Sequence, residues 1–141
     1  MLADATRLPF RTGTFDLIFT GPPWDHLDVL GDAKPELERV LRPDGLMVLL
    51  LPYLQDRKKA TMVVTDRHWT RSDLTVVPAP RVRRGPRYFS PADDFVRRVI
   101  ARHNPRRLLD PFCGVGTIPR IASAMGVDAH GCDIDAEAVF A

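Results

Sequence analysis

Cysteine is scarce in this sequence: Cys113 and Cys132 are the only two among 141 residues. Two cysteines are too few for a disulfide framework, and a structural metal site needs more ligands at regular spacing. The four histidines do not supply them, since they show no triad or metal-binding spacing. We therefore expect both thiols to be reduced and buried, and we expect no metal.

Long hydrophobic runs are also missing. No stretch of about eighteen apolar residues occurs, and the first ten residues, MLADATRLPF, lack the basic-then-apolar pattern of a signal peptide. These absences argue against secretion and membrane insertion, so we expect a cytoplasmic protein with no membrane partner. The sequence contains no internal repeat or low-complexity tract, and its length predicts a single domain over residues 1–141.

Positive charge is concentrated in one segment, although the net charge is only +2. Between Gln55 and Tyr88 the chain carries nine lysines and arginines against three aspartates. Such a segment is typical of a surface that contacts phosphates. A solvated loop remains an equal alternative at this point, because prolines and a glycine interrupt the same stretch.

The first half of the chain predicts a β-α-β unit. Residues 15–19 are almost continuously apolar, as in a strand covered on both faces. The segment DAKPELERVLRPDG then predicts a helix, with Pro35 in its first turn, that ends in a turn at RPDG. Residues 46–52 predict a second central strand, and weaker alternation in residues 67–80 indicates an edge hairpin.

The second half repeats the alternation of strands and helices. Ser90 is placed to cap a helix with Pro91 at its first position, and the apolar residues that follow form one stripe up to His103. Residues 106–112 predict a short strand, residues 117–126 a helix ended by glycine, and residues 127–135 another strand. The predicted fold is α/β, a Rossmann-like three-layer sandwich around a mostly parallel sheet.

A glycine-rich turn follows the predicted strand at residues 106–112. Gly114 and Gly116 let the backbone approach a ligand, and Asp133 follows at the end of the next strand, where a carboxylate can accept both hydroxyls of a ribose. Pro119 occupies the place of the third glycine of the dinucleotide fingerprint, which argues against a pyrophosphate cofactor. Asp110 before the turn favours an ammonium group, so the pattern indicates S-adenosylmethionine, which has an ammonium, a carboxylate and a ribose.

Three motifs resemble those of nucleic-acid amino-methyltransferases. The segment DPFCGVGTI is similar to their cofactor motif, LADATRLPF to the acidic segment that reaches the adenine ring, and GPPW to their catalytic motif. The catalytic motif precedes the cofactor motif, an order similar to the circularly permuted beta group of DNA adenine-N6 and cytosine-N4 methyltransferases. The cofactor motif is also similar to that of tRNA guanine-N2 methyltransferases, which usually have the unpermuted order.

The resemblance implies residues for each task. The cofactor residues it implies are Asp4, Ala5, Asp110, Pro111, Phe112, Cys113, Gly114, Gly116, Thr117, Asp133 and Ile134. Phe112 is expected as a wall of the cofactor pocket, and Thr117 is also expected to cap its helix. Asp4 is weighed equally as a surface residue. The implied organisation is a catalytic half (1–54), a basic segment with a hairpin (55–89) and a cofactor-binding half (90–141).

The catalytic turn is implied to consist of Gly21, Pro22, Pro23 and Trp24. Two prolines stiffen the turn and present carbonyl oxygens to an exocyclic amine, which positions its nitrogen for methyl transfer, while Trp24 stacks on an extruded base. Packing of Trp24 at the domain edge is the alternative. Gly21 departs from the family, which has Asp, Asn or Ser there, and the lost hydrogen bond is worth roughly 1.5–3 kcal/mol, or about a ten- to hundredfold in rate.

The basic segment is implied to contact nucleic acid, with DNA favoured over RNA. The candidate residues are Arg57, Lys58, Lys59, Arg81, Arg83, Arg84 and Arg87. Trp69 in the same segment is expected in the hairpin core rather than in recognition. Because the segment is short for a recognition domain, we expect low sequence specificity, or specificity supplied by a dimer partner or a recognition subunit. The alternative functions are an RNA base N-methyltransferase and a weak or inactive subunit that binds cofactor and nucleic acid.

Overall fold

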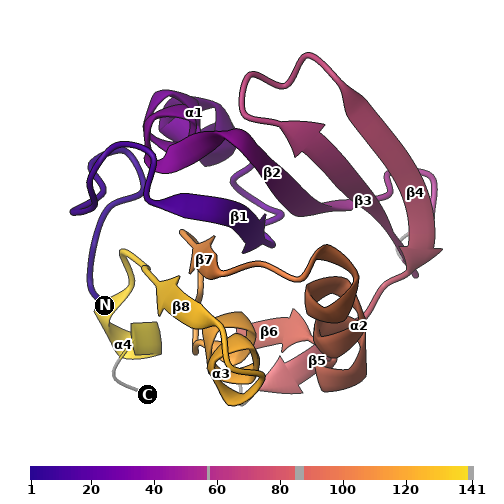
Figure 1. Ribbon diagram of the computed structural model, residues 1–141. Helices are drawn as coiled ribbons and strands as arrows, with labels where there is room; N and C mark the ends of the chain where they lie inside the picture. The colour runs from indigo at the N-terminus through magenta and orange to yellow at the C-terminus, as the bar shows by residue number, and fades with distance from the viewer. Residues whose placement is uncertain (57, 85–87, 140–141) are drawn as a thin grey trace.

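A six-stranded sheet forms the centre of the computed structural model, which describes residues 1–56, 58–84 and 88–139 (Figure 1). The strand order is β4-β3-β2-β1-β7-β8. The strands are β1 (Phe15–Thr20), β2 (Leu41–Pro52), β3 (Lys59–Asp66), β4 (Ser72–Pro78), β7 (Arg107–Asp110) and β8 (Asp128–Gly131). The pairs β1-β2, β1-β7 and β7-β8 are parallel, whereas β3 pairs antiparallel with both β2 and β4. The mostly parallel α/β sheet predicted from the sequence is confirmed.

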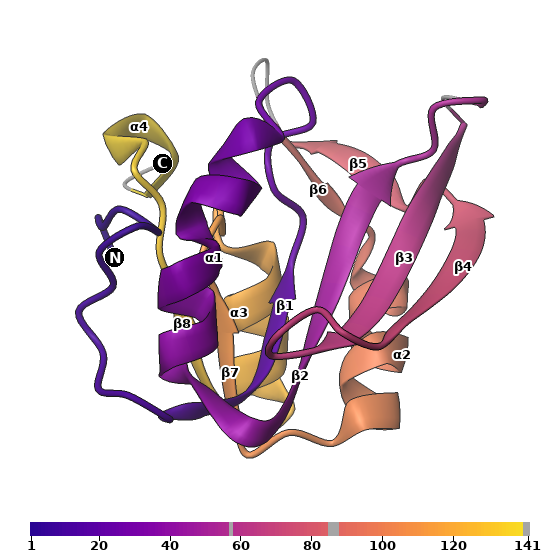
Figure 2. The same ribbon diagram turned by 90° about the horizontal axis from the view of Figure 1, so that it is seen from above.

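Helices cover both faces of this sheet, as Figures 1 and 2 show. On one face lies α1 (Asp28–Val40), and on the other lie α2 (Asp93–His103) and α3 (Thr117–Ala124). Each side has its own apolar cluster: Leu37 packs with Phe15 and Ile18, whereas Ile100 packs with Leu17 and Phe19 in the cluster across the sheet. The successive residues Leu17, Ile18 and Phe19 therefore enter opposite clusters, and both clusters are buried, which explains why these three residues of the strand are all apolar.

The prediction for α1 was wrong in its boundaries. The helix begins at Asp28 and contains Pro35 in its interior, not in its first turn. Leu30 and Ala33 join Leu37 on the buried face, so burial extends the helix one turn further than the predicted start. Pro35 lacks the N–H that would bond to the carbonyl one turn earlier, a cost that this packing offsets.

The predicted turn at RPDG is part of β2. The helix ends at Val40, and β2 begins at once with Leu41. Between residues 41 and 46 the pairing with β1 shifts register, so RPDG forms an irregularity within the strand. A Cβ on Gly45 would lie 2.7 Å from the Leu41 side chain, so glycine is needed for this bend.

The edge hairpin exists but begins earlier than predicted. It comprises β3 and β4, and residues 67–71 form its turn. Trp69 has a positive φ of 61° and packs against the core, and its indole N–H lies 3.3 Å from the Met47 sulfur. The prediction that Trp69 is a core residue is confirmed.

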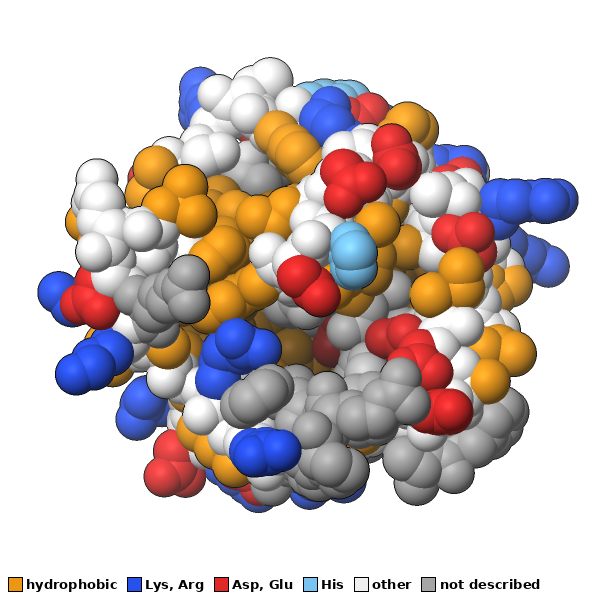
Figure 3. All heavy atoms as spheres, turned by 180° about the vertical axis from the view of Figure 1, so that it is seen from behind, with side chains coloured by type: hydrophobic (Ala, Val, Ile, Leu, Met, Phe, Trp, Pro, Cys, Tyr) orange, Lys and Arg blue, Asp and Glu red, His pale blue; other side chains and the backbone are white. Residues whose placement is uncertain are grey.

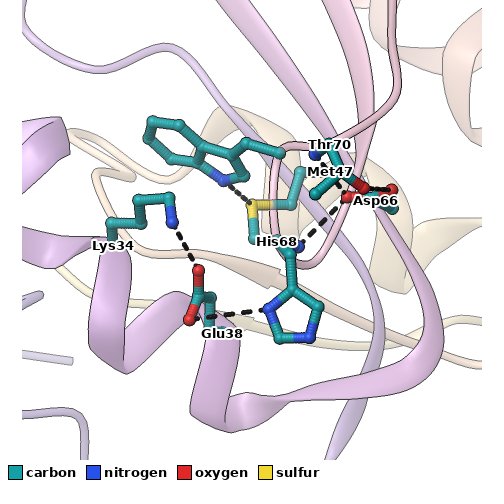
Figure 4. Close-up of polar contacts among 7 residues, drawn as sticks. Lys34, Glu38, Met47, Asp66, His68 and Thr70 are labelled. Atoms are coloured by element: carbon teal, nitrogen blue, oxygen red, sulfur yellow. Dashed lines mark hydrogen bonds and ion pairs between the residues drawn. The ribbon is translucent and has the colours of Figure 1, made fainter.

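Contacts with α1 hold the turn of this hairpin (Figure 4). His68 Nδ1 lies 3.7 Å from a carboxylate oxygen of Glu38, which also pairs with Lys34 at 2.5 Å. Asp66 accepts hydrogen bonds from the backbone amides of His68 and Thr70. The edge hairpin is thus attached to the layer formed by α1.

The start of α2 corrects the sequence prediction. Ser90 and Pro91 belong to β6 (Tyr88–Pro91), which pairs with β5 (Arg81–Arg84) in a separate two-stranded ribbon. Ala92 is the N-cap residue, and no side chain caps the helix. The predicted boundary between residues 89 and 90 therefore cuts through β6. The apolar stripe is confirmed, with Val96, Val99 and Ile100 buried.

The last helix of the described residues is the short α4 (Ala136–Val139). Among the helices in the described part of the chain, none is long and apolar enough to cross a membrane.

Cys132 is buried and Cys113 half-buried, and both are free thiols. Burial raises the pKa of Cys113 to about 12 and that of Cys132 to about 11, which keeps both thiols protonated.

Candidate active site

Two turns meet at the carboxyl edge of the sheet. Residues 21–27 leave the end of β1, and residues 111–116 leave the end of the adjacent β7. Figure 3 looks onto this edge, which is hollowed near its centre, with hydrophobic side chains on one side and acidic side chains gathered on the other. Neighbouring parallel strands thus bring together two motifs that are about 90 residues apart in the sequence.

A buried hydrogen bond joins the two strand ends. The Thr20 hydroxyl donates to Asp110 Oδ1 across 2.5 Å, and the Phe112 backbone N–H donates to the same oxygen across 3.1 Å. Asp110 is only 2% exposed. Burial raises its pKa to about 7, although both hydrogen bonds oppose this shift. Asp110 therefore lies beneath the cavity surface and fixes the geometry of the two turns.

The larger of the two cavities at this edge has a volume of about 590 Å³. Seven of the eleven predicted cofactor residues line it: Asp4, Ala5, Pro111, Phe112, Gly114, Asp133 and Ile134. Gly21 and Pro23 of the predicted catalytic turn line it as well. The structure thus brings the three sequence motifs around one space, and Phe112 is part of its wall.

The lining of this cavity is acidic. Its charged residues are Asp4, Asp32, Asp133 and Asp135, and no lysine or arginine is among the described residues that line it. Hydrogen bonds from the Thr6 backbone and hydroxyl lower the pKa of Asp4, so its carboxylate stays charged. Such a lining favours a cationic ligand and disfavours phosphates.

Asp133 organises the glycine turn. Its Oδ2 accepts the Gly114 backbone N–H across 2.8 Å, and its Oδ1 accepts the Asp135 backbone N–H across 2.9 Å. The chain start extends the sheet beside it, since Leu2 bridges to Asp133 in parallel and Ala3 donates to the Asp133 carbonyl. This pairing places Asp4 beside the end of β8.

Four predicted cofactor residues do not line the cavity: Asp110, Cys113, Gly116 and Thr117. The predicted cap at Thr117 was wrong, because Gly116, with a φ of 86°, is the N-cap residue and Thr117 is the buried first residue of α3. No side chain caps this helix. A positive φ at the cap is accessible to glycine at little cost, which accounts for the second glycine of the motif.

Several lining residues were missed by the sequence analysis. They are Thr6, His26, Val29, Asp32, Asp135 and Ala138. Val29 and Asp32 are three residues apart on α1. Val29 was missed because the helix was predicted to start only at Asp32. His26 and Ala138 have no local sequence signal.

The second cavity, of about 460 Å³, lies on the other side of the catalytic turn. It is lined by Gly21, Pro22, Pro23, Trp24, Asp25, Leu50, Pro80, Arg81, Ser90 and Pro91. Gly21 and Pro23 therefore line both cavities. The turn forms the junction between an acidic cavity and a second space beside an aromatic ring.

Trp24 is fixed in the wall of the second cavity. Its indole N–H donates to the Leu50 carbonyl across 3.1 Å, and the Arg81 guanidinium lies 4.3 Å from the ring centroid. The side chain is half-buried. The hydrogen bond sets the direction of the ring, whose stacking partner in this structure is Arg81.

Gly21 has room for a side chain. An added Cβ would meet only Leu50, at 3.7 Å from its Cβ and 3.9 Å from its carbonyl oxygen, which is ordinary contact. The φ of Gly21 is not in the left-handed region that favours glycine. The absence of an acidic or amide side chain at this position is therefore not imposed by the backbone.

The candidate nucleic-acid residues are only partly gathered at the site. Lys58 and Lys59 lie at the start of β3, beside the end of β2, and therefore at the same edge of the sheet as the turns. Arg81 lines the second cavity, and Arg83 is exposed on the same strand. Arg57 and Arg87 lie outside the described residues, as does the side chain of Arg84.

Comparisons with known proteins give a partial family match and solved structures of similar fold. A family model for a methyltransferase domain matches residues 1–49. TTHA0409 of Thermus thermophilus, provisionally named a DNA modification methylase, superposes with a TM-score of 0.65 at 16% identity, covering 99% of this chain and 89% of that chain. Its complex with S-adenosyl-L-methionine gives a TM-score of 0.64 at 16% identity, with coverages of 99% and 88%.

A second solved structure has the same fold. The complex of M1.HpyAVI with SAM superposes with a TM-score of 0.55 at 20% identity, covering 96% of this chain and 92% of that chain. No curated protein sequence matches this chain. The comparisons show a Rossmann-like methyltransferase fold, and S-adenosylmethionine is the cofactor they support.

Proposed function

We propose that this protein transfers a methyl group from S-adenosylmethionine to an exocyclic amine of a base in nucleic acid, with DNA preferred. The observation that carries the proposal is the sharing of Gly21 and Pro23 by two cavities. A methyl donor in one cavity and an amine in the other would meet at this turn, which is the arrangement that transfer by positioning requires.

The acidic cavity supports the cofactor assignment. S-adenosylmethionine carries a sulfonium and an ammonium group, and four aspartates line this space. We assign cofactor binding to the predicted residues that line it, with Asp133 at the ribose and Asp4 towards the adenine. Asp110, Cys113, Gly116 and Thr117 would then act from beneath the surface by shaping the turn.

The catalytic turn would act through its carbonyl oxygens. An exocyclic amine is a poor nucleophile because its lone pair is delocalised into the ring. Acceptors on its hydrogens favour a tetrahedral nitrogen aimed at the methyl group. Gly21 and Pro22 would supply these carbonyls, and Trp24 would stack on the base. The transfer forms an N–C bond, breaks the S–C bond and leaves a neutral thioether, while the amine loses one proton.

The remaining features refine the proposal. The catalytic motif precedes the cofactor motif along the chain, consistent with a circularly permuted domain over residues 1–141 whose halves are 1–54 and 90–141. Lys58, Lys59, Arg81 and Arg83 would contact nucleic acid, as would Arg57, Arg84 and Arg87 of the same segment. An RNA base remains the alternative substrate, and sequence specificity would come from a dimer partner or a recognition subunit. We place the protein in the cytoplasm.

One observation favours a second function. Gly21 lacks the side-chain acceptor of the resembled family, although the structure has room for it. A weak or inactive subunit that binds cofactor and nucleic acid would retain both cavities and lose only this group.

Isothermal titration with S-adenosylmethionine and with its demethylated product tests the cofactor part of the proposal. We expect both to bind, and we expect Asp133→Ala to abolish binding. Asp128→Ala, at an exposed position that pairs with Arg107 and His130, is the matched control. Absence of binding to the unaltered protein would contradict the proposal.

A further inference from the structure

Arg81 lies where the proposed function needs a base. Its guanidinium is centred 4.3 Å from the Trp24 ring, within the second cavity that both residues line. The residue begins β5, in the ribbon that closes this cavity from the side opposite the catalytic turn. A planar cation therefore occupies the stacking position on the aromatic ring in the ligand-free protein.

Arg81 is an exposed residue whose guanidinium is covered in part. Burial lowers the pKa of its guanidinium, and the nearby Asp25 carboxylate opposes this shift. This partial cover accompanies the contact of the guanidinium with the Trp24 ring, 4.3 Å from the ring centroid.

Resting on the proposed function, we propose that Arg81 is an internal competitor of the target base: its guanidinium holds the base position on Trp24, and a base binds only by displacing it. A guanidinium and a nucleobase are both flat and stack on an aromatic face. The hydrogen bond from the indole N–H to the Leu50 carbonyl fixes the direction of the ring, and the base would take the face that Arg81 covers.

This competition raises the Kd of every base by the same factor, so a base must stack well to bind measurably. Stacking of a base on an aromatic ring is generally stronger than an exposed contact between a cation and a ring, so a base can win. The difference in strength between base stacking and the cation–ring contact is largest for the bases that stack best, which are the purines. Among the amine-bearing targets, stacking on Trp24 thus favours adenine over cytosine, with Arg81 present or absent.

A titration with free nucleosides tests the competition, because nucleosides carry no phosphate. Trp69→Phe leaves Trp24 as the only tryptophan, and quenching of its fluorescence by deoxyadenosine reports stacking. In this background we expect Arg81→Ala to lower the Kd of deoxyadenosine about two- to fivefold, because an internal competitor is removed. Arg81→Lys keeps the charge without the flat group. Its Kd for deoxyadenosine should lie between that of Arg81→Ala and that of the protein that keeps Arg81.

Arg97→Ala is the matched control, since Arg97 is exposed on α2 and its loss removes the same charge. We expect it to leave the Kd unchanged, and we expect deoxycytidine to bind more weakly than deoxyadenosine to the protein with Arg81 intact. The inference is overturned if Arg81→Ala binds deoxyadenosine no more tightly than the protein that keeps Arg81. It is also overturned if deoxyadenosine does not quench the fluorescence of that variant. The proposed function fails by a different readout, the absence of methyl transfer.

Discussion

The Thr20 hydroxyl donates a hydrogen bond to Asp110 across 2.5 Å in the interior of the protein. These residues end β1 and β7, the two neighbouring strands from which the catalytic and cofactor turns emerge. Because a buried bond joins them directly, neither turn can shift without disturbing the other. The relative position of methyl donor and amine, on which the proposed reaction depends, is thus set beneath both cavities.

Asp110 makes stability depend on pH. Its pKa in the folded protein is about 7, above the ordinary value of 3.8, so the folded state retains a proton that the unfolded chain has lost. The stabilisation from this proton is full below about pH 4 and is lost as the pH rises to about 7.

We therefore expect the free energy of unfolding of the unaltered protein, relative to Asp110→Asn, to fall between pH 4 and pH 7, by at most about 1.4 kcal/mol for each pH unit. Urea denaturation of both proteins across this range measures it. A constant difference would show that Asp110 is not protonated in the fold.

Trp24 should affect the rate of methyl transfer and not the affinity for the cofactor. It lines the second cavity, whereas the acidic cavity is bounded by Gly21 and Pro23 without it. We expect Trp24→Ala to reduce methyl transfer by about tenfold or more, since stacking of a base is worth about 1–3 kcal/mol. Calorimetry should give an unchanged Kd for S-adenosylmethionine. A loss of cofactor affinity would show that Trp24 supports the fold of the site instead.

The sequence allowed the sheet and its two turns to be predicted, since apolar strands followed by proline or glycine are local signals. Boundaries governed by tertiary packing were missed: α1 starts early because Leu30 and Ala33 are buried, and Ser90 pairs in a ribbon instead of capping a helix. His26 illustrates the same limit at the site, because only the path of the turn brings it to the cavity.

A restored side-chain acceptor should accelerate the reaction. An Asn at position 21 would add an amide oxygen beside the proposed carbonyl acceptors, in space that is open to a Cβ. We expect Gly21→Asn to raise the rate of methyl transfer about ten- to hundredfold. Gly21→Ala adds the Cβ without the acceptor and should give no gain. Equal rates for both variants would refute the role of an acceptor here.

The edge hairpin should depend on Trp69. This side chain packs on the core, and its indole N–H contacts Met47. We expect Trp69→Ala to lower the free energy of unfolding by about 3 kcal/mol, the lower end of the range for large aromatic truncations. His68→Ala, at an exposed position in the same turn, should cost less than about 1 kcal/mol. Urea denaturation compares them, and equal losses would contradict the packing role.

The most direct test of the central claim is transfer of a labelled methyl group from S-adenosylmethionine to mixed DNA and, separately, to total RNA, followed by nucleoside analysis. The account predicts label in DNA, in a single type of base methylated on its exocyclic amine. Absence of label from both nucleic acids, alongside clear cofactor binding, would contradict it and would mean that the turn has kept its shape without its chemistry.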